Sequence, residues 1–216
     1  MIFTITIFIE AICLGFALWF LRREASWWKY FVTFLAITVF TELVGFVLFF
    51  VQGQKNHWVF NIYLLPEIAF LFFALDKLSK GLFRASALLM LAFLGFAGVY
   101  GYESWSSNWT GYSANANTVA SVTIIIVACI YYYHLLKQQD PIPLKRSASF
   151  WIVSGLLVFY FGSMGCNLFV EQLTAIYNET GFPLRFIIMA LLNFILYACW
   201  AYAFICRYRQ TISSSP

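Results

Sequence analysis

Long apolar runs follow one another along this chain, and short stretches rich in charge or in Gly, Pro and Asn separate them. A membrane-spanning helix needs about 20 mostly apolar residues, because the hydrocarbon core is about 30 Å thick and each helical residue rises about 1.5 Å. The runs predict seven such helices, at about residues 2–21, 28–51, 58–75, 82–101, 117–136, 149–171 and 184–206.

Composition supports a membrane rather than water as the solvent of this chain. Of the 216 residues, 62% are hydrophobic, 21% aromatic and only 10% charged, whereas soluble domains carry about 25% charged residues. Seven spans use nearly the whole length. We therefore expect one all-α transmembrane domain at 1–210, a polytopic seven-helix bundle, followed by a short cytoplasmic tail at 211–216.

The positive charges predict which way the bundle faces. Eleven Lys and Arg residues follow the first, third, fifth and seventh runs, and the other two, Lys55 and Arg185, lie in the remaining connections. Because Lys and Arg collect in cytoplasmic loops, the N-terminus is expected outside and the C-terminus in the cytoplasm, most simply of a bacterial inner membrane. Since these charges are spread over short loops, the net charge of +4 does not indicate nucleic-acid binding.

Several chemistries of seven-helix proteins lack the residues that they need. A retinal protein requires a Lys in its last span, and residues 184–206 contain none. The two histidines, His57 and His134, fall at opposite membrane faces, so no zinc or haem ligand set forms. The cysteines lie inside predicted spans without a CxxC pair, as small apolar packing residues do. We expect no metal and no cofactor, and the sequence favours a non-enzymatic role.

Ionisable groups at membrane depth are the main candidates for function, because a charge is costly there. Glu10 and Glu67 fall near the middle of the first and third spans, and Glu42 falls in the outer half of the second. Glu171 ends the sixth span and Arg185 opens the seventh, both on the outer side. A carboxylate at such depth must be protonated, paired or in contact with water.

Helical spacing places these groups on polar stripes. Ser163, Asn167 and Glu171 follow each other at four-residue steps, and Tyr63 lies four residues before Glu67. Since lipid offers polar groups no partner, we predict a pocket in the outer half of the bundle for ligand binding or proton relay. Its candidate residues are Glu10, Glu42, Asn61, Tyr63, Glu67, Ser163, Asn167, Glu171, Arg185 and Asn193.

A packing role is the alternative for each of these residues. Buried Asn, Ser and Glu side chains can simply hydrogen-bond to neighbouring helices. Glu171 and Arg185 can form an ordinary ion pair at the rim, and Glu10 can share a proton with Glu42 or Glu67. Glu42 and Glu67 favour function over packing, since no Lys or Arg is predicted at their depth.

Both halves of the chain contain distinctive short motifs: Thr41-Glu42-Leu43, Asn56-His57-Trp58, Asn61-Ile62-Tyr63 with Glu67, Phe150-Trp151, Ser154-Gly155-Leu156-Leu157, Tyr160-Phe161-Gly162 and Leu192-Asn193. Together these motifs resemble a family of small seven-span proteins of Bacteroidota. Some relatives in that family carry a similar bundle ahead of a histidine kinase. The resemblance implies a sensory or partner-coupled membrane module, whose signal passes to a separate protein.

Three functions stay open at this point. The first is a sensory or receptor-like bundle that binds a small-molecule or lipid ligand in the outer pocket and signals to a membrane or cytoplasmic partner. The second is a structural or regulatory subunit of a larger membrane complex. The third is a small proton-coupled transporter that uses Glu42 and Glu67, although the chain shows no clear internal repeat of the kind found in small carriers.

Overall fold

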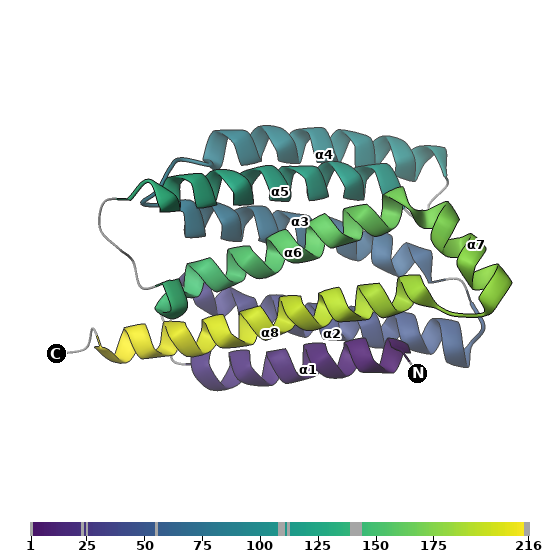
Figure 1. Cartoon of the computed structure of the whole chain (residues 1–216), viewed down its shortest axis with the longest axis horizontal. Coiled ribbons are helices and arrows are strands. Elements are labelled where there is room, and N and C mark those ends of the chain that lie inside the picture. Colours follow the sequence, from purple (N-terminus) through teal and green to yellow (C-terminus); the bar gives the residue numbers. More distant parts are fainter. Residues whose placement is uncertain are drawn as a thin grey trace. The chain divides into compact units, whose positions relative to one another are not determined.

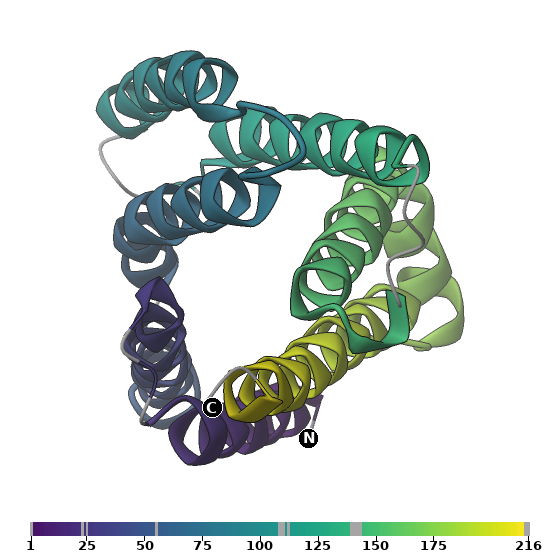
Figure 2. The ribbon, with the colours of Figure 1, turned by 90° about the vertical axis from the view of Figure 1, so that its left-hand side faces the viewer.

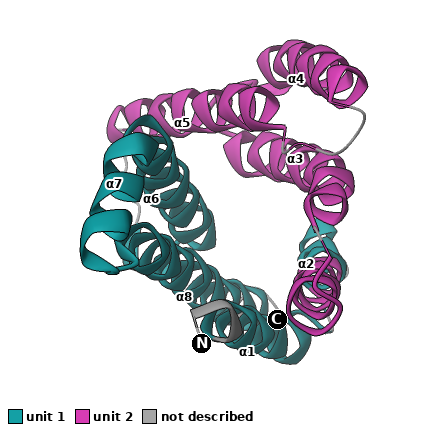
Figure 3. Ribbon diagram, turned by 90° about the vertical axis from the view of Figure 1, so that its right-hand side faces the viewer, with its two compact units in different colours: residues 1–35, 142–216 teal, residues 36–141 magenta. Residues whose placement is uncertain are grey.

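The computed structural model describes residues 2–22, 24, 26–54, 56–107, 111, 113–138 and 144–213, and this part of the chain contains helices and turns but no strand. The chain divides into two compact units, residues 1–35 with 142–216 (unit 1) and residues 36–141 (unit 2), as Figure 3 shows by colour. The boundary between the units falls inside one helix, α2.

The helices follow the predicted spans closely, with one addition. In chain order they are α1 (Ile2–Leu21), α2 (Tyr30–Phe46), α3 (His57–Ser79), α4 (Ser86–Ser106), α5 (Ala114–Leu136), α6 (Ala148–Leu168), α7 (Val170–Thr180) and α8 (Leu184–Ser213). A 3₁₀ turn at Trp27–Lys29 precedes α2, a π-helical turn at Val47–Val51 follows it, and another 3₁₀ turn at Leu144–Arg146 precedes α6. The all-helical prediction is therefore confirmed.

Six helical segments are long and apolar enough to cross a membrane: Trp27–Val51, α3, α4, α5, α6 and residues 184–212 of α8. The described apolar part of α1, Ile5–Leu21, is shorter. Large apolar side chains are exposed on these helices, for example Trp19 at 81% and Leu91 at 73%. Such a surface fits lipid better than water. The chain is accordingly an integral membrane protein.

Unit 1 is built around α8, which packs against both α1 and α6 (Figures 1 and 2). Two glycines of α6 make room for α8. A Cβ at Gly155 would lie 3.0 Å from the Cβ of Cys199, and one at Gly162 would lie 2.5 Å from a Leu192 methyl carbon. Small residues at these positions let the helices approach closely, as they do in membrane bundles generally.

Trp200 lies at the centre of an aromatic cluster in unit 1. It is 1% exposed, and its ring meets Phe31 edge-on at a centroid distance of 5.3 Å. Phe34 and Tyr197 each lie 5.9 Å from the same indole. This cluster anchors the N-terminal part of α2, which carries Phe31 and Phe34, on α8.

Unit 2 contains the α4–α5 pair, which Figure 1 shows running side by side, and α3, which packs against both. Its core is apolar, with Ile68, Leu75, Phe96 and Ile124 fully buried. At one end of the unit Phe83, in the α3–α4 turn, stacks on His134 of α5 with the ring centroids 5.1 Å apart. The α3–α4 turn therefore lies against the C-terminal end of α5.

The predicted polar stripe Ser163, Asn167, Glu171 is wrong in its last member. The helix α6 ends at Leu168, and Glu171 lies in the first turn of the separate helix α7. None of the residues of α7 is buried, and its apolar and polar residues alternate at helical spacing, as in helices that lie along a membrane surface. Gly181, with a φ of 70°, caps α7 in the left-handed conformation that Gly adopts most readily.

Candidate functional site

The candidate site centres on a hydrogen bond between α2 and α3 in unit 2. The Thr38 hydroxyl and the Tyr63 hydroxyl are 2.6 Å apart. Thr38 is 5% exposed and Tyr63 is half-buried. Hydroxyl groups can donate and accept at once, so this pair satisfies two polar groups where lipid could not.

A second contact fixes the direction of the two helices. The Asn56 side-chain amide donates to the Gly45 carbonyl oxygen at 3.1 Å. A Cβ at Gly45 would lie 2.7 Å from the Phe60 ring, so a larger residue would displace that ring. Since residue 45 meets residues 56 and 60 while residue 38 meets residue 63, the helices are antiparallel.

The antiparallel arrangement separates the two predicted carboxylates. Glu42 lies one turn from Thr38 toward Gly45, and Glu67 lies one turn from Tyr63 in the opposite direction. At about 1.5 Å per residue, the two positions are about 12 Å apart along the helices, with the Thr38–Tyr63 pair between them. Both side chains are half-buried. They flank the hydroxyl pair and do not form a shared carboxylate dyad.

Asn61, another predicted site residue, is fully buried and holds the α4–α5 connection. Its side-chain nitrogen donates to the Gly111 carbonyl at 2.6 Å, and its side-chain oxygen accepts from the Ser113 backbone N–H at 3.1 Å. The Tyr100 hydroxyl donates to the Asn61 backbone carbonyl at 2.9 Å. We call Asn61, Tyr100, Gly111 and Ser113 the polar clamp.

Glu103 adds a further tie at the same connection. Its carboxylate accepts from the backbone N–H groups of Asn115 and Ala116, at 3.1 Å and 2.9 Å, and from the Asn115 side chain at 2.7 Å. A carboxylate satisfies the free N–H groups of a helix N-terminus and complements its dipole. The end of α4 therefore caps the start of α5.

The other predicted residues belong to unit 1. Glu10 and Ser163 are buried, at 2% and 8% exposure. Asn193 donates to the Met189 carbonyl one turn before it at 3.0 Å. Asn167, Glu171 and Arg185 are exposed, and in the described part of the chain Glu171 and Arg185 do not form an ion pair.

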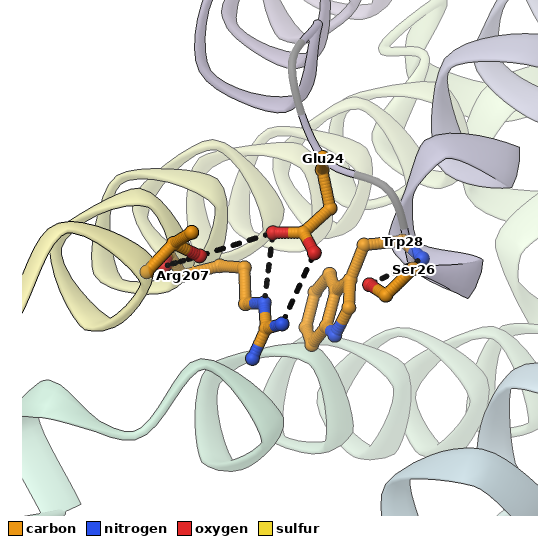
Figure 4. A network of polar contacts seen from close by, with 5 residues as sticks. Glu24, Ser26, Trp28 and Arg207 are labelled. Carbon is orange, nitrogen blue, oxygen red and sulfur yellow. Dashed lines mark hydrogen bonds and ion pairs between the residues drawn. The ribbon is translucent and has the colours of Figure 1, made fainter. Parts of the chain in front are cut away.

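Sequence reasoning missed a network at the C-terminal end of α8, which Figure 4 shows from close by. The Arg207 guanidinium donates to both oxygens of Glu24, at 3.2 Å and 3.1 Å, and the Thr211 hydroxyl donates to Glu24 at 3.1 Å. The guanidinium also lies over the Trp28 ring, 5.7 Å from its centroid. We call Glu24, Trp28, Arg207 and Thr211 the α8 network.

The Glu24 carboxylate stays ionised throughout the physiological range. Burial raises its pKa, but hydrogen bonds from Arg207, Ser26 and Thr211 and the Arg207 charge outweigh burial and lower the pKa to about 2. A signal for this group was visible in the sequence. Glu24 is an acidic residue in one of the connections where the basic residues collect, and such a carboxylate is well placed to pair with a cation.

Backbone carbonyls before α6 complete the same end of unit 1. The Lys145 carbonyl accepts from the Trp151 indole N–H at 3.2 Å and from the Cys206 thiol at 3.6 Å. The Arg146 carbonyl accepts from the Gln210 side chain at 2.9 Å. The α1–α2 connection and the start of α6 are thus both tied to the end of α8.

The described side chains do not assemble a familiar reaction centre. Among them, no group of three or more His, Cys, Asp or Glu could hold a metal ion. The α2–α3 site offers instead two hydroxyls and two carboxylates, which suit hydrogen bonding to a polar or cationic group. Comparison of the chain with protein-family models, with curated proteins and with solved structures finds no match.

Proposed function

We propose that the chain crosses a bacterial cytoplasmic membrane seven times, with its N-terminus outside. The 20 residues of α1 rise about 30 Å, which is enough to span the hydrocarbon core as a seventh helix. The charge asymmetry supports the orientation, since the end of unit 1 that holds the α8 network carries Arg22, Lys29, Arg207 and Arg209. In this orientation Glu42 lies in the outer half and the α8 network lies in the cytoplasm.

In that setting, the protein acts as a sensory or receptor-like bundle that binds a small or lipidic ligand. The observation that carries this proposal is the double role of α2. Toward its C-terminal end α2 carries Thr38, bonded to Tyr63, and Glu42. Its N-terminal part carries Phe31 and Phe34, which pack on Trp200 of α8.

A helix transmits a displacement along its length because its backbone hydrogen bonds keep it stiff. A ligand that binds to the Thr38–Tyr63 pair or to Glu42 would move α2. The aromatic cluster around Trp200 would pass that movement to α8. The α8 network lies about two turns beyond Trp200 on the same helix. A partner protein in the cytoplasm or membrane would read the change there, a helix shift of the kind common in switching proteins.

The experiment starts from the purified chain in nanodiscs and compares Glu42→Gln, Glu67→Gln and wild type. Glu179→Gln, at an exposed position of α7, is the matched control. Extraction and mass spectrometry identify small molecules and lipids that co-purify, and hydrogen exchange measures protection of residues 206–212. We expect wild type and the control to retain a molecule that both α2–α3 variants lose. Removing that molecule should change exchange at residues 206–212.

Three results would count against this proposal. If no molecule is retained, and both variants match wild type in thermal stability between pH 5 and pH 9, the pocket loses its support. A protein that co-purifies in fixed ratio and is unaffected by either variant would favour the alternative role as a subunit of a membrane complex. Proton uptake into sealed vesicles that requires both carboxylates would favour the transporter.

A further inference from the structure

The α3–α4 turn of unit 2 forms an open surface pocket of about 640 Å³, called the hollow below. It is lined by Asp76, Lys80, Gly81, Phe83, Arg84 and Ser86 among others. The turn is held in shape from two sides. The Ser86 hydroxyl donates to the Asp76 carboxylate at 2.6 Å, and Phe83 stacks on His134.

The hollow carries more positive charge than its own carboxylate balances. Lys80 and Arg84 are both exposed, and within the described residues neither forms an ion pair. The Lys77 and Lys80 ammonium groups also repel each other. Asp76 already accepts from Ser86. An anion with several acceptor oxygens, such as a phosphate, would bind to Lys80 and Arg84 and relieve this repulsion.

The surface next to the hollow is apolar. From its first turn onward, α4 exposes large apolar side chains: Leu88 at 42%, Met90 at 69%, Leu91 at 73% and Leu94 at 60%. These residues belong to a helix that is apolar and long enough to span the membrane, so they face acyl chains. A ligand with a phosphate at the turn and apolar chains along α4 would match both surfaces.

We propose that the α3–α4 turn binds the phosphate of an anionic phospholipid, with Lys80 and Arg84 as its charged contacts and the exposed face of α4 against its acyl chains. Basic groups beside a membrane helix attract anionic headgroups. The α3–α4 turn is separate from the α2–α3 site, and this proposal depends on the membrane setting alone.

The test uses the full chain, delipidated in an uncharged detergent, and native mass spectrometry. Wild type is titrated with phosphatidylglycerol, phosphatidylcholine, glycerol 3-phosphate and inorganic phosphate. The double variant Lys80→Gln/Arg84→Gln is compared with Lys145→Gln/Arg146→Gln, which removes the same charge from another exposed pair. All four substitutions are at exposed positions, and thermal melts check that both variants keep their fold.

We expect wild type and the control double variant to bind phosphatidylglycerol with similar Kd values. The Lys80→Gln/Arg84→Gln variant should raise that Kd about tenfold or more. Phosphatidylcholine should bind more weakly than phosphatidylglycerol. The proposal would be overturned if Lys145→Gln/Arg146→Gln weakened phosphatidylglycerol binding as much as Lys80→Gln/Arg84→Gln does. Equal binding of phosphatidylglycerol and phosphatidylcholine to wild type would also overturn it. If glycerol 3-phosphate or inorganic phosphate saturated the site at the same concentrations as phosphatidylglycerol, the ligand would be a free phosphate compound and not a lipid.

Discussion

Arg207 and Glu24 form a two-point ion pair across 183 residues of sequence, with both nitrogen–oxygen distances between 3.1 Å and 3.2 Å. The Glu24 side chain is 8% exposed and that of Arg207 is 29% exposed. A planar guanidinium matches the two oxygens of a carboxylate, so the pair fixes orientation as well as distance. It ties the α1–α2 connection to the end of α8.

Replacing Arg207 tests the strength of this tie. We expect Arg207→Gln to lower the free energy of unfolding by about 1–3 kcal/mol, because a largely buried carboxylate would lose its cation. The free energy of unfolding of Arg207→Lys should fall between those of wild type and Arg207→Gln, since Lys keeps the charge but cannot bond to both carboxylate oxygens as the planar guanidinium does. Thermal unfolding in detergent measures the effect. Arg209→Gln, two residues along at an exposed position, should match wild type, and an equal loss there would show that general charge is responsible.

The pH dependence of stability gives an independent test of the same pair. The pKa of Glu24 is about 2 in the folded protein, against an ordinary value of 4.5. The folded state therefore binds a proton less readily than the unfolded state. The stability that Glu24 contributes is fully present above about pH 4.5 and is lost as the pH falls toward 2.

Glu24→Gln removes that contribution at every pH. The difference in melting temperature between wild type and Glu24→Gln should be constant from pH 5 to pH 7 and should shrink below pH 4.5. Melting curves of the two proteins across this range, in one buffer series, measure it. A difference that grows on acidification would mean that Glu24 is not paired as the structure has it.

Local patterns were sufficient to predict the spans. The bounds of α1 match the predicted run at 2–21, because the apolar composition ends at Arg22 and Arg23. The break between α6 and α7 was missed, because Leu168, Phe169 and Val170 continue the apolar run without Pro or Gly. Gly181 and Pro183, just after α7, were the available sign that a separate helix ends there.

The site was harder to predict than the spans. Glu42 and Glu67 were identified from their depth, but their distance along the α2–α3 pair depends on which residues meet, and Thr38–Tyr63 sets that register. Asn61 was predicted as a pocket residue, whereas its side chain bonds to Gly111 and Ser113, about 50 residues away. Contacts over such separations leave no periodic signal in one sequence.

The α6–α8 packing predicts opposite effects for two glycines of one helix. A Cβ at Gly155 would lie 3.0 Å from the Cys199 Cβ and 3.2 Å from the Leu196 backbone oxygen, whereas a Cβ at Gly165 would meet nothing within 4 Å. Gly155→Ala should therefore cost about 1–3 kcal/mol through overpacking. Gly165→Ala should be neutral or stabilise by up to about 1 kcal/mol, since Ala favours a helix.

Thermal unfolding of both variants measures this contrast. The same substitution in the same helix controls for helix propensity and for added apolar surface. If both variants behaved alike, close approach of α6 and α8 would not be what requires Gly155.

The polar clamp predicts that Asn61 stabilises the α4–α5 connection. Asn61→Ala removes the acceptor of the buried Ser113 N–H and the donor to the half-buried Gly111 carbonyl, and leaves both backbone groups without these partners. Each such group costs about 1–3 kcal/mol, so the variant should lose about 2–4 kcal/mol and its Ser113 amide should exchange faster. Asn193→Ala is the control, because the Asn193 side chain bonds to the Met189 carbonyl in its own helix. Hydrogen exchange separates the two variants: Asn193→Ala should leave Ser113 protected, and if Asn61→Ala also leaves it protected, the clamp does not hold this connection in solution.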